Sequence, residues 1–280
     1  MARCRTNAER LRQGFKERYG SWALIAGASE GLGAAYARAL AARGMNLVLV
    51  ARRKTLLDAL ADDLRRDSAV EVRCTDGDLS DLEFLGTLQA ACSSLDLGLV
   101  VYNATHAPVG EFAAVAFEDL MRVVDVNVRA PMALLRSLLP AMTSRGRGAV
   151  ILMTSLAGNQ GSPRLAAYAA SKAFTRVLAE TLWYELSDKG VDVVACCAGA
   201  VRTPGYAMAA GKDAPGTLDP EEVVERALRA LGHGPIVVPG LVNRAANVFM
   251  GRLLPRRAAI AIMGGSTSSL APAKPTEEGL

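Results

Sequence analysis

Histidine is scarce in this 280-residue sequence, which argues against catalysis by a Ser-His-Asp triad. There are two histidines, and neither His106 nor His233 has a recognisable nucleophile motif around it. We expect His106 to be loop surface, although its loop could also approach a substrate. The five cysteines show no zinc-ligand spacing, so we expect no metal site. Cys196 and Cys197 fall on an apolar run, where small core thiols are expected rather than a redox pair.

Long apolar runs and strong net charge are also missing. The sequence has no stretch of about 18 apolar residues and no signal-peptide pattern, which predicts a cytoplasmic protein without a transmembrane segment. The formal net charge is only +4, and the basic residues are spread along the chain. A nucleic-acid partner is therefore not expected.

Hydrophobic residues are plentiful, and their arrangement predicts the fold. They make up 51% of the sequence, and short apolar runs alternate with helical stretches, as in consecutive βαβ units. The runs are almost continuously hydrophobic, which is typical of parallel strands covered on both faces. We therefore expect one α/β domain, with a single doubly wound parallel sheet and helices on both faces. The expected strands are residues 22–26, 46–50, 70–74, 97–102, 148–154, 191–197 and 235–238.

A glycine-rich turn follows the first expected strand. The sequence GASEGLG, from Gly27 to Gly33, separates that strand from a helical stretch, and a second apolar run comes next. Strand, glycine turn, helix and strand is the context of a dinucleotide-binding loop. Glycines allow the backbone to approach a pyrophosphate closely, and the helix N-terminus stabilises its charge. Because the spacing differs from the commoner G-x-G-x-x-G, the context carries this prediction more than the glycines do.

The end of the second strand bears on which nucleotide binds. An acidic residue about 20 positions past the glycine turn would hydrogen-bond the ribose 2′-hydroxyl and repel a 2′-phosphate. The sequence has Arg52 and Arg53 at this place, and a guanidinium group suits a phosphate. NADP(H) is therefore favoured over NAD(H), although both arginines could be solvated surface charges. Glu30 argues mildly the other way, because it puts a negative charge near the pyrophosphate.

Tyr168 and Lys172 lie four residues apart, and Ser155 precedes the tyrosine by thirteen residues. Residues i and i+4 of a helix share a face, so the ammonium can lie near the phenol. A nearby cation would lower the tyrosine pKa from its ordinary value of about 10. Such a phenol can act as a general acid or base at a ketone or alcohol oxygen, which the serine hydroxyl could hold. A lone Tyr-x-x-x-Lys pair is more often a surface contact, so the assignment depends on the other motifs.

Together, these motifs resemble those of the short-chain dehydrogenase/reductase family over about residues 20–240. The catalytic positions that match the family pattern are Asn127, Ser155, Tyr168 and Lys172. The candidate cofactor-binding positions, including the two arginines, are Gly27, Ser29, Glu30, Gly31, Leu32, Gly33, Arg52, Arg53, Asp78, Leu79, Asn103, Ala104, Tyr168, Lys172, Gly199, Val201 and Thr203. The resemblance implies that Asp78 and Leu79 lie beside the adenine and that Asn127 holds a water that links Lys172 to solvent.

Several positions depart from the family pattern. Ala26 replaces a threonine that would brace the glycine turn, and Ala198 replaces a proline after the sixth strand. Tyr102 and Thr105 replace an asparagine and a glycine beside Asn103. These changes could loosen cofactor binding, but none removes a chemical step.

The resemblance implies a Rossmann-like oxidoreductase that interconverts a ketone and a secondary alcohol, with Tyr168 as general acid or base, and the two arginines favour NADP(H) as its cofactor. It also implies a homodimer or homotetramer formed through the helices that carry Asn127 and Tyr168. One alternative is a reductase of 3-oxoacyl thioesters, whose phosphates Arg202 or the arginines past residue 240 could bind. An alternative of another class is a catalytically silent nucleotide-binding sensor or scaffold. The loss of a catalytic position would have favoured this alternative, and none of the four is lost.

Residues 204–218 are rich in glycine, alanine and proline, and we expect a mobile segment there. Asp219 and Pro220 then mark a helix start, with the aspartate as N-cap. The resemblance implies that the segment lies over the substrate, where Tyr206 and Met208 would favour a bulky apolar molecule. An ordinary surface loop is the other interpretation.

The two ends of the chain are expected to add helices and a tail. Residues 1–19 predict an N-terminal helical extension, and residues 241–263 predict an apolar helical segment with four arginines. The second segment could pack against another subunit, cover the pocket or, as the least favoured option, lie on an anionic membrane surface. Pro255 would divide it into two helices. Residues 264–280 are expected to be a disordered tail.

Overall fold

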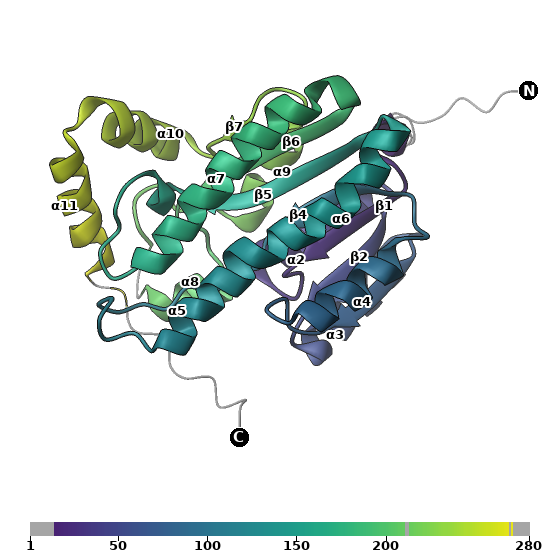
Figure 1. Ribbon diagram of the computed structural model, residues 1–280, viewed down its shortest axis with the longest axis horizontal. Coiled ribbons are helices and arrows are strands. Elements are labelled where there is room, and N and C mark those ends of the chain that lie inside the picture. The colour runs from purple at the N-terminus through teal and green to yellow at the C-terminus, as the bar shows by residue number, and fades with distance from the viewer. Residues whose placement is uncertain (1–13, 211–212, 269, 271–280) are drawn as a thin grey trace, which may run out of the picture.

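A seven-stranded parallel sheet forms the centre of the protein (Figure 1). The computed structural model describes residues 14–210, 213–268 and 270. The strands are β1 (Trp22–Ala26), β2 (Asn46–Ala51), β3 (Val72–Asp76), β4 (Leu97–Tyr102), β5 (Gly148–Ser155), β6 (Val191–Ala198) and β7 (Ile236–Val237). Their order in the sheet is β3-β2-β1-β4-β5-β6-β7. The expected doubly wound parallel sheet is confirmed, and its strand order reverses between β1 and β4.

The strand boundaries agree closely with the apolar runs. β1 and β4 occupy the expected residues, and β2, β5 and β6 each extend one residue further. β3 begins two residues later than expected, at Val72, because the Val70 amide donates to the Ser68 carbonyl in the preceding turn. It continues to Asp76, which pairs with Ala51 of β2.

Helices cover both faces of the sheet, as expected (Figure 1). The helices α2 (Gly31–Ala42), α3 (Lys54–Asp67) and α9 (Pro220–Ala230) pack on one face, and α4 (Leu82–Cys92), α6 (Ala130–Arg145) and α7 (Ala166–Leu186) pack on the other. Because successive strand residues point to opposite faces, Ile25 faces the core that contains Tyr36 of α2, whereas Leu24 faces the core that contains Leu134 of α6. The other labelled helices are α5 (Phe117–Val124), α8 (Pro204–Ala209), α10 (Leu241–Val248) and α11 (Arg256–Thr267).

The segment between β6 and α9 differs in detail from the expectation. It contains the short helix α8, whose start Thr203 caps by accepting a hydrogen bond from the Tyr206 amide at 3.2 Å. Asp219 precedes α9 as expected, but its carboxylate accepts a bond from Arg202 at 2.8 Å rather than from the helix backbone. This ion pair ties the start of α9 to the residues that follow β6.

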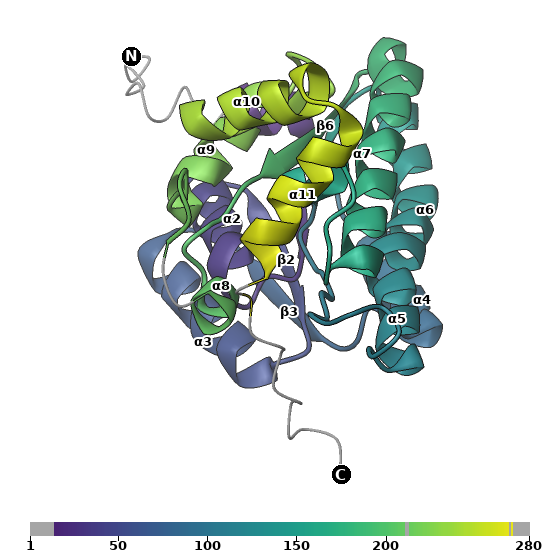
Figure 2. The same ribbon diagram turned by 90° about the vertical axis from the view of Figure 1, so that its left-hand side faces the viewer.

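The C-terminal helices α10 and α11 stand at one end of the molecule and face the viewer in Figure 2. α10 continues into the π-helical turn η4 (Phe249–Leu253), and the chain then bends before Pro255, as expected. α11 reaches Thr267, past the expected start of the tail at residue 264. Its end is held by Arg164, which donates to the carbonyl groups of Thr267 and Ser268 at 3.1 and 2.7 Å.

The structure describes only part of the expected terminal segments. A helix over residues 14–19 lies within the expected N-terminal extension. The rest of that extension and residues 271–280 of the expected tail lie outside the described residues. Within the described part of the chain, we find no helix with the length and apolar character needed to cross a membrane.

Candidate active site

The glycine turn lies at the carboxyl edge of the sheet, where the strand order reverses. The amides of Gly27 and Ala28 both donate to the Val50 carbonyl of β2, at 2.8 and 3.0 Å, and so fix the start of the turn. A Cβ atom on Gly33 would lie 1.9 Å from the Gly27 carbonyl oxygen, so only glycine lets α2 begin this close to the turn. Ligands of doubly wound sheets bind in the crevice at such a switch point.

The end of β4 is bonded directly to this turn. The backbone amides of Asn103 and Ala104 both donate to the Ala26 carbonyl, at 2.9 and 2.8 Å. The Asn103 side chain donates to the Gly27 carbonyl at 2.9 Å. The two candidate cofactor-binding segments therefore form one connected backbone surface.

The charges beside the turn separate the two candidate arginines. Arg53 lies 2.7 Å from a Glu30 carboxylate oxygen and donates to the Ser29 hydroxyl at 3.2 Å. Arg52 is exposed, and it has no carboxylate partner among residues 14–210, 213–268 and 270. Because Arg53 pairs with Glu30, Arg52 is the arginine at the end of β2 that has no carboxylate oxygen within 4.0 Å among the described residues.

Asp78 and Leu79 follow β3 on the same edge. One Asp78 carboxylate oxygen accepts bonds from the Ser80 amide and hydroxyl at 2.9 and 2.8 Å, and the other accepts from Arg122. Partial burial opposes ionisation, but these bonds and the guanidinium groups of Arg122 and Arg52 hold the pKa of Asp78 below its ordinary value. The carboxylate is therefore charged and fixed in place, while Leu79 is buried.

Ser155, Tyr168 and Lys172 meet at the end of β5. Ser155 is the last residue of β5, and the other two lie one helical turn apart on one face of α7. The Lys172 ammonium is buried, lies 5.5 Å from the Tyr168 ring centroid and donates to the Met153 carbonyl at 2.9 Å. The helix thus carries a proton donor and a cation beside a strand that ends in a hydroxyl.

The pKa values differ from the expectation. Lys172 is expected to lower the pKa of Tyr168, but burial raises that pKa above its ordinary value of 10.0, and the Ser155 hydroxyl only opposes the rise. The Lys172 ammonium is bonded to Met153, and its own pKa is lowered by burial from 10.5 to about 8. In this structure the phenol is therefore held in its neutral, proton-donating form.

Asn127 is buried in the π-helical turn η1 (Asp125–Arg129), which joins α5 to α6. Its side-chain amide donates to the His106 carbonyl at 2.9 Å and to the Ser171 hydroxyl at 3.0 Å. Its carbonyl oxygen accepts from the His106 amide at 2.8 Å. Ser171 in turn donates to the Tyr168 carbonyl at 2.7 Å, so hydrogen bonds connect Asn127 to α7, the helix that carries Tyr168 and Lys172.

Sequence reasoning missed the roles of His106 and Ser171. The backbone of His106 holds Asn127, while its ring Nε2 lies 2.9 Å from an Asp119 carboxylate oxygen of α5. Ser171 lies three residues after Tyr168, a helical spacing that could have indicated its bond to the Tyr168 carbonyl. No local pattern indicates the partners of His106, because they come from distant parts of the chain.

The segment after β6 completes this edge. Val201 is buried and pairs with Leu218, and the Thr203 side chain lies beside Gly31 of the glycine turn. A Cβ atom on Gly199 would lie 2.6 Å from the Asn243 side-chain oxygen, so a glycine is required for α10 to pack there. Of the three candidate residues after β6, Gly199 is therefore the one that packs directly against a C-terminal helix.

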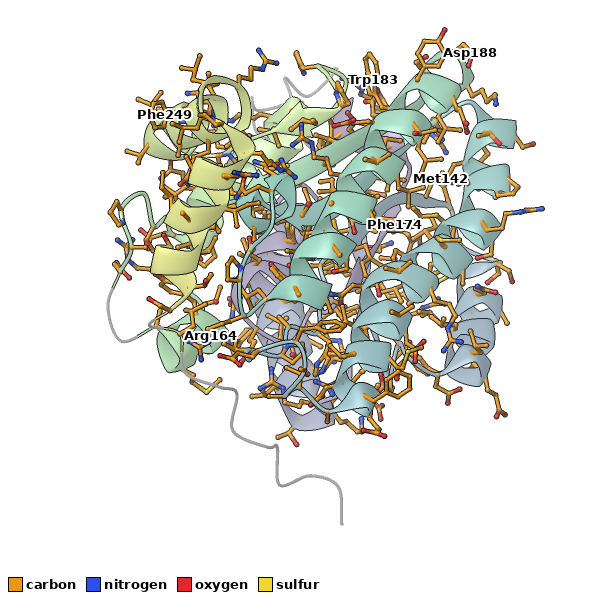
Figure 3. All side chains as sticks on the ribbon, turned by 60° about the vertical axis from the view of Figure 1, so that its left-hand side comes forward. Met142, Arg164, Phe174, Trp183, Asp188 and Phe249 are labelled. Carbon is orange, nitrogen blue, oxygen red and sulfur yellow. The ribbon has the colours of Figure 1, made fainter. Side chains whose placement is uncertain are left out.

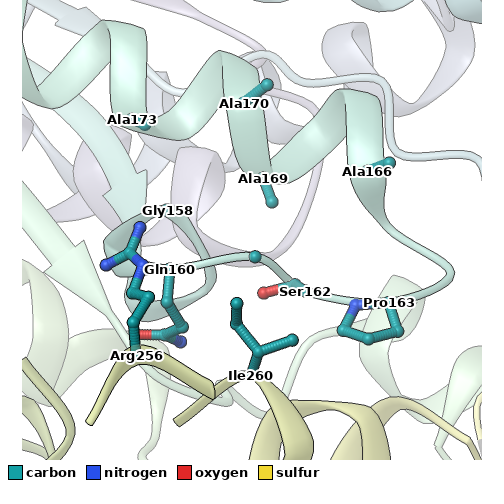
Figure 4. Close-up of a pocket in the computed structure, with 11 residues that line it drawn as sticks. Gly158, Gln160, Ser162, Pro163, Ala166, Ala169, Ala170, Ala173, Arg256 and Ile260 are labelled. Carbon is teal, nitrogen blue, oxygen red and sulfur yellow. The ribbon is translucent and has the colours of Figure 1, made fainter.

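A cavity of about 450 Å³ lies between α7, residues 158–163 and α11 (Figure 4). Small residues line its α7 wall, and Arg256 and Ile260 line its α11 wall. Arg256 donates to the Asn159 carbonyl at 2.7 Å, which helps to hold α11 against this loop. The lining includes neither Ser155 nor Tyr168, so the cavity is separate from the candidate catalytic group.

A doubly wound sheet with a glycine turn at its switch point and a Ser–Tyr–Lys group at the same edge defines a Rossmann-type oxidoreductase. The family model described as short chain dehydrogenase matches residues 21–213. The chain belongs to the short-chain dehydrogenase family, and it is an oxidoreductase.

Known members of the family show similar sequences and structures. A 7β-hydroxysteroid dehydrogenase of Clostridium sardiniense is 34% identical over 233 residues, which cover 82% of this chain and 89% of the relative. A solved 7β-hydroxysteroid dehydrogenase structure has a TM-score of 0.83 and 31% identity, and the match covers 89% of this chain and 98% of that one. A short-chain dehydrogenase from Sphingobium yanoikuyae in complex with NADPH has a TM-score of 0.74 and 31% identity, with coverages of 92% and 99%.

Proposed function

We propose that this enzyme uses NADP(H) to interconvert a ketone and a secondary alcohol on a bulky apolar substrate, with Tyr168 as the general acid or base. The grouping of Ser155, Tyr168 and Lys172 at the same sheet edge as the glycine turn carries the proposal. The family match supports the reaction class, and the hydroxysteroid dehydrogenases among the relatives support a large apolar substrate.

The cofactor preference is supported by charge. The residues of the glycine turn fit a dinucleotide, because Gly33 leaves space for a close backbone approach at the N-terminus of α2. Arg52 is exposed and lacks a carboxylate partner within the described residues, so its planar guanidinium is available for a 2′-phosphate. The NADPH complex of the Sphingobium protein is consistent with this assignment.

In the proposed reduction, bound NADPH supplies the hydride. The Ser155 hydroxyl holds the carbonyl oxygen, and Tyr168 donates its proton to that oxygen as negative charge develops. The raised pKa keeps the phenol protonated at neutral pH, which suits reduction. Oxidation of the alcohol needs the phenolate and is therefore favoured at alkaline pH.

Lys172 and Asn127 are proposed to help return a proton from solvent to Tyr168 after it has protonated the substrate. With a pKa of about 8, the buried Lys172 ammonium can gain and lose a proton near neutral pH. The Asn127 carbonyl oxygen accepts one bond from His106 and has a second lone pair that can accept a bond from a water. This arrangement supports the expected water between Lys172 and solvent.

The segment after β6 is proposed to cover the substrate. Met208 of α8 is 79% exposed, and the Tyr206 hydroxyl accepts a bond from the Ala214 amide at 3.0 Å. A bulky apolar substrate would bury such side chains. The hydroxysteroid dehydrogenases among the relatives support such a substrate.

We further propose that the enzyme is a cytoplasmic homodimer or homotetramer. Large apolar side chains on α5, α6 and α7 are exposed, which supports an interface through these helices. They are Met121, Val124, Met132, Val177 and Tyr184. Light scattering after size-exclusion chromatography tests this, and a monomer would contradict it.

The function is tested by following NADPH and NADH oxidation over a panel of steroid, small and acyl-thioester ketones. We expect NADPH to be preferred and steroid-like ketones to react fastest. Fastest turnover of 3-oxoacyl thioesters would instead support the alternative reductase. No turnover in either direction with any substrate would support the silent sensor.

A further inference from the structure

The outer surface of α10 and η4 exposes large apolar side chains. We call residues 241–257 the C-terminal corner, and Figure 3 shows Phe249 at its outer side. Leu241, Phe249 and Leu253 are 74%, 50% and 69% exposed, and Val242 is 55% exposed. Such a cluster on one short stretch of helix is typical of an interaction surface.

The same corner carries cations without counterions. Arg244, Arg252 and Arg257 are exposed and form no ion pair with the residues that the structure describes. Several arginines elsewhere on the surface are paired, such as Arg38 and Arg66 with Asp63. The sequence has no acidic residue between Glu225 and Glu277, so the positive charge of the corner is not balanced locally.

The arginines without ion pairs favour an anionic bilayer over a second copy of this chain as the partner of the corner. A two-fold interface between copies of this chain would place the corner against itself and bring the unpaired arginines of both copies together. An anionic bilayer offers headgroup phosphates to the arginines and an apolar interior to the leucines and phenylalanine. We propose that the C-terminal corner docks on the surface of an anionic lipid bilayer.

The corner is also joined to the segment after β6. Asn243 of α10 is buried and donates to the carbonyl groups of Gly216 and Pro239, both at 3.0 Å. A docked corner would thus hold residues 213–218 near the bilayer, where apolar molecules partition. This connection to substrate uptake rests on the proposed function, whereas docking itself does not.

Co-sedimentation of the full-length protein with vesicles tests the docking. We expect binding to phosphatidylcholine vesicles that contain phosphatidylglycerol, weaker binding at high salt, and little binding to pure phosphatidylcholine. The triple variant Arg244→Gln, Arg252→Gln and Arg257→Gln should lower the partition coefficient about 100-fold. No binding of the wild-type protein to anionic vesicles would overturn the proposal.

A second triple variant controls for net charge. Arg38→Gln, Arg66→Gln and Arg229→Gln removes the same charge from exposed sites outside the corner, and we expect it to bind anionic vesicles nearly as well as the wild type. An equal loss in both triple variants would show that only total charge matters and would overturn the proposal.

The apolar side chains are tested separately. The variant Leu241→Ser, Phe249→Ser and Leu253→Ser should lose at least about tenfold in vesicle binding. Its melting temperature and its size on light scattering should match the wild type, because the side chains are exposed. Dissociation of an oligomer in this variant, with vesicle binding unchanged, would assign the corner to a second copy and refute bilayer docking.

Discussion

Replacing Lys172 with methionine should change how the stability of the protein depends on pH. Burial lowers the pKa of Lys172 from 10.5 to about 8. Below about pH 8 the lysine is protonated in both the folded and the unfolded chain, and the folded state bears the cost of burying the charge. Between about pH 8 and the unfolded pKa, the unfolded chain binds more protons, so the free energy of unfolding rises with pH.

The size of this effect follows from the shift. Each pKa unit corresponds to about 1.4 kcal/mol, so from about pH 7 to about pH 10 the wild type should gain roughly 3 kcal/mol of stability relative to Lys172→Met. Near neutral pH, the methionine avoids the cost of a buried charge but leaves the Met153 carbonyl without its 2.9 Å partner, which costs about 1–3 kcal/mol. We therefore expect the variant to be about as stable as the wild type at neutral pH, although catalytically inactive.

Urea unfolding of the cofactor-free proteins in steps of pH measures this difference. Contributions from other titrating groups cancel when the variant is subtracted from the wild type. Measurements should stop at about pH 10, above which unfolded tyrosines ionise. Lys189→Met, at an exposed site, is the matched control. A wild-type minus Lys172→Met difference that stays flat or falls with pH would refute the burial argument.

Three further changes test the site. Tyr168→Phe should lower turnover at least about 10²-fold without weakening NADPH binding measured by fluorescence, and wild-type-like turnover would exclude this residue as the acid. Arg52→Ser should raise the KM for NADPH about tenfold and leave that for NADH unchanged, whereas equal effects would remove its role at the 2′-phosphate. Ser171→Ala should lower kcat more than it raises KM, because Asn127 loses a partner at 3.0 Å, and Ser171→Thr should restore part of the activity.

The sequence predicts most of the sheet and the local motifs of the site. Most of its strands are short apolar runs, so their ends could be placed within one or two residues, whereas β3 has the mixed sequence VRCTD. The i, i+4 spacing of Tyr168 and Lys172 likewise places both on one helix face. Features of this kind depend on neighbours along the chain, and a single sequence records them directly.

Contacts between distant segments could not be predicted in this way. The pairing of Arg53 with Glu30 decides which of the two arginines lacks a carboxylate partner among the described residues, yet this pairing depends on how the glycine turn approaches β2. The partner of Asp219 is likewise a residue from another segment, Arg202, rather than its own helix. The prediction that the pKa of Tyr168 falls is wrong for the same reason. Burial raises this pKa, and the Lys172 ammonium donates to the Met153 carbonyl of β5.

The contact between Gly199 and Asn243 has a consequence for engineering. The asparagine side chain fills the space that a Cβ atom at residue 199 would need, and it also holds the Gly216 and Pro239 carbonyl groups. The glycine at residue 199 and the asparagine at residue 243 therefore fit each other, although more than forty residues separate them in the sequence. A chimera that exchanges the C-terminal helices with those of another dehydrogenase therefore has to exchange residue 199 as well. Otherwise the residue after β6 and the side chain of α10 that packs on it will come from different proteins and will not fit together.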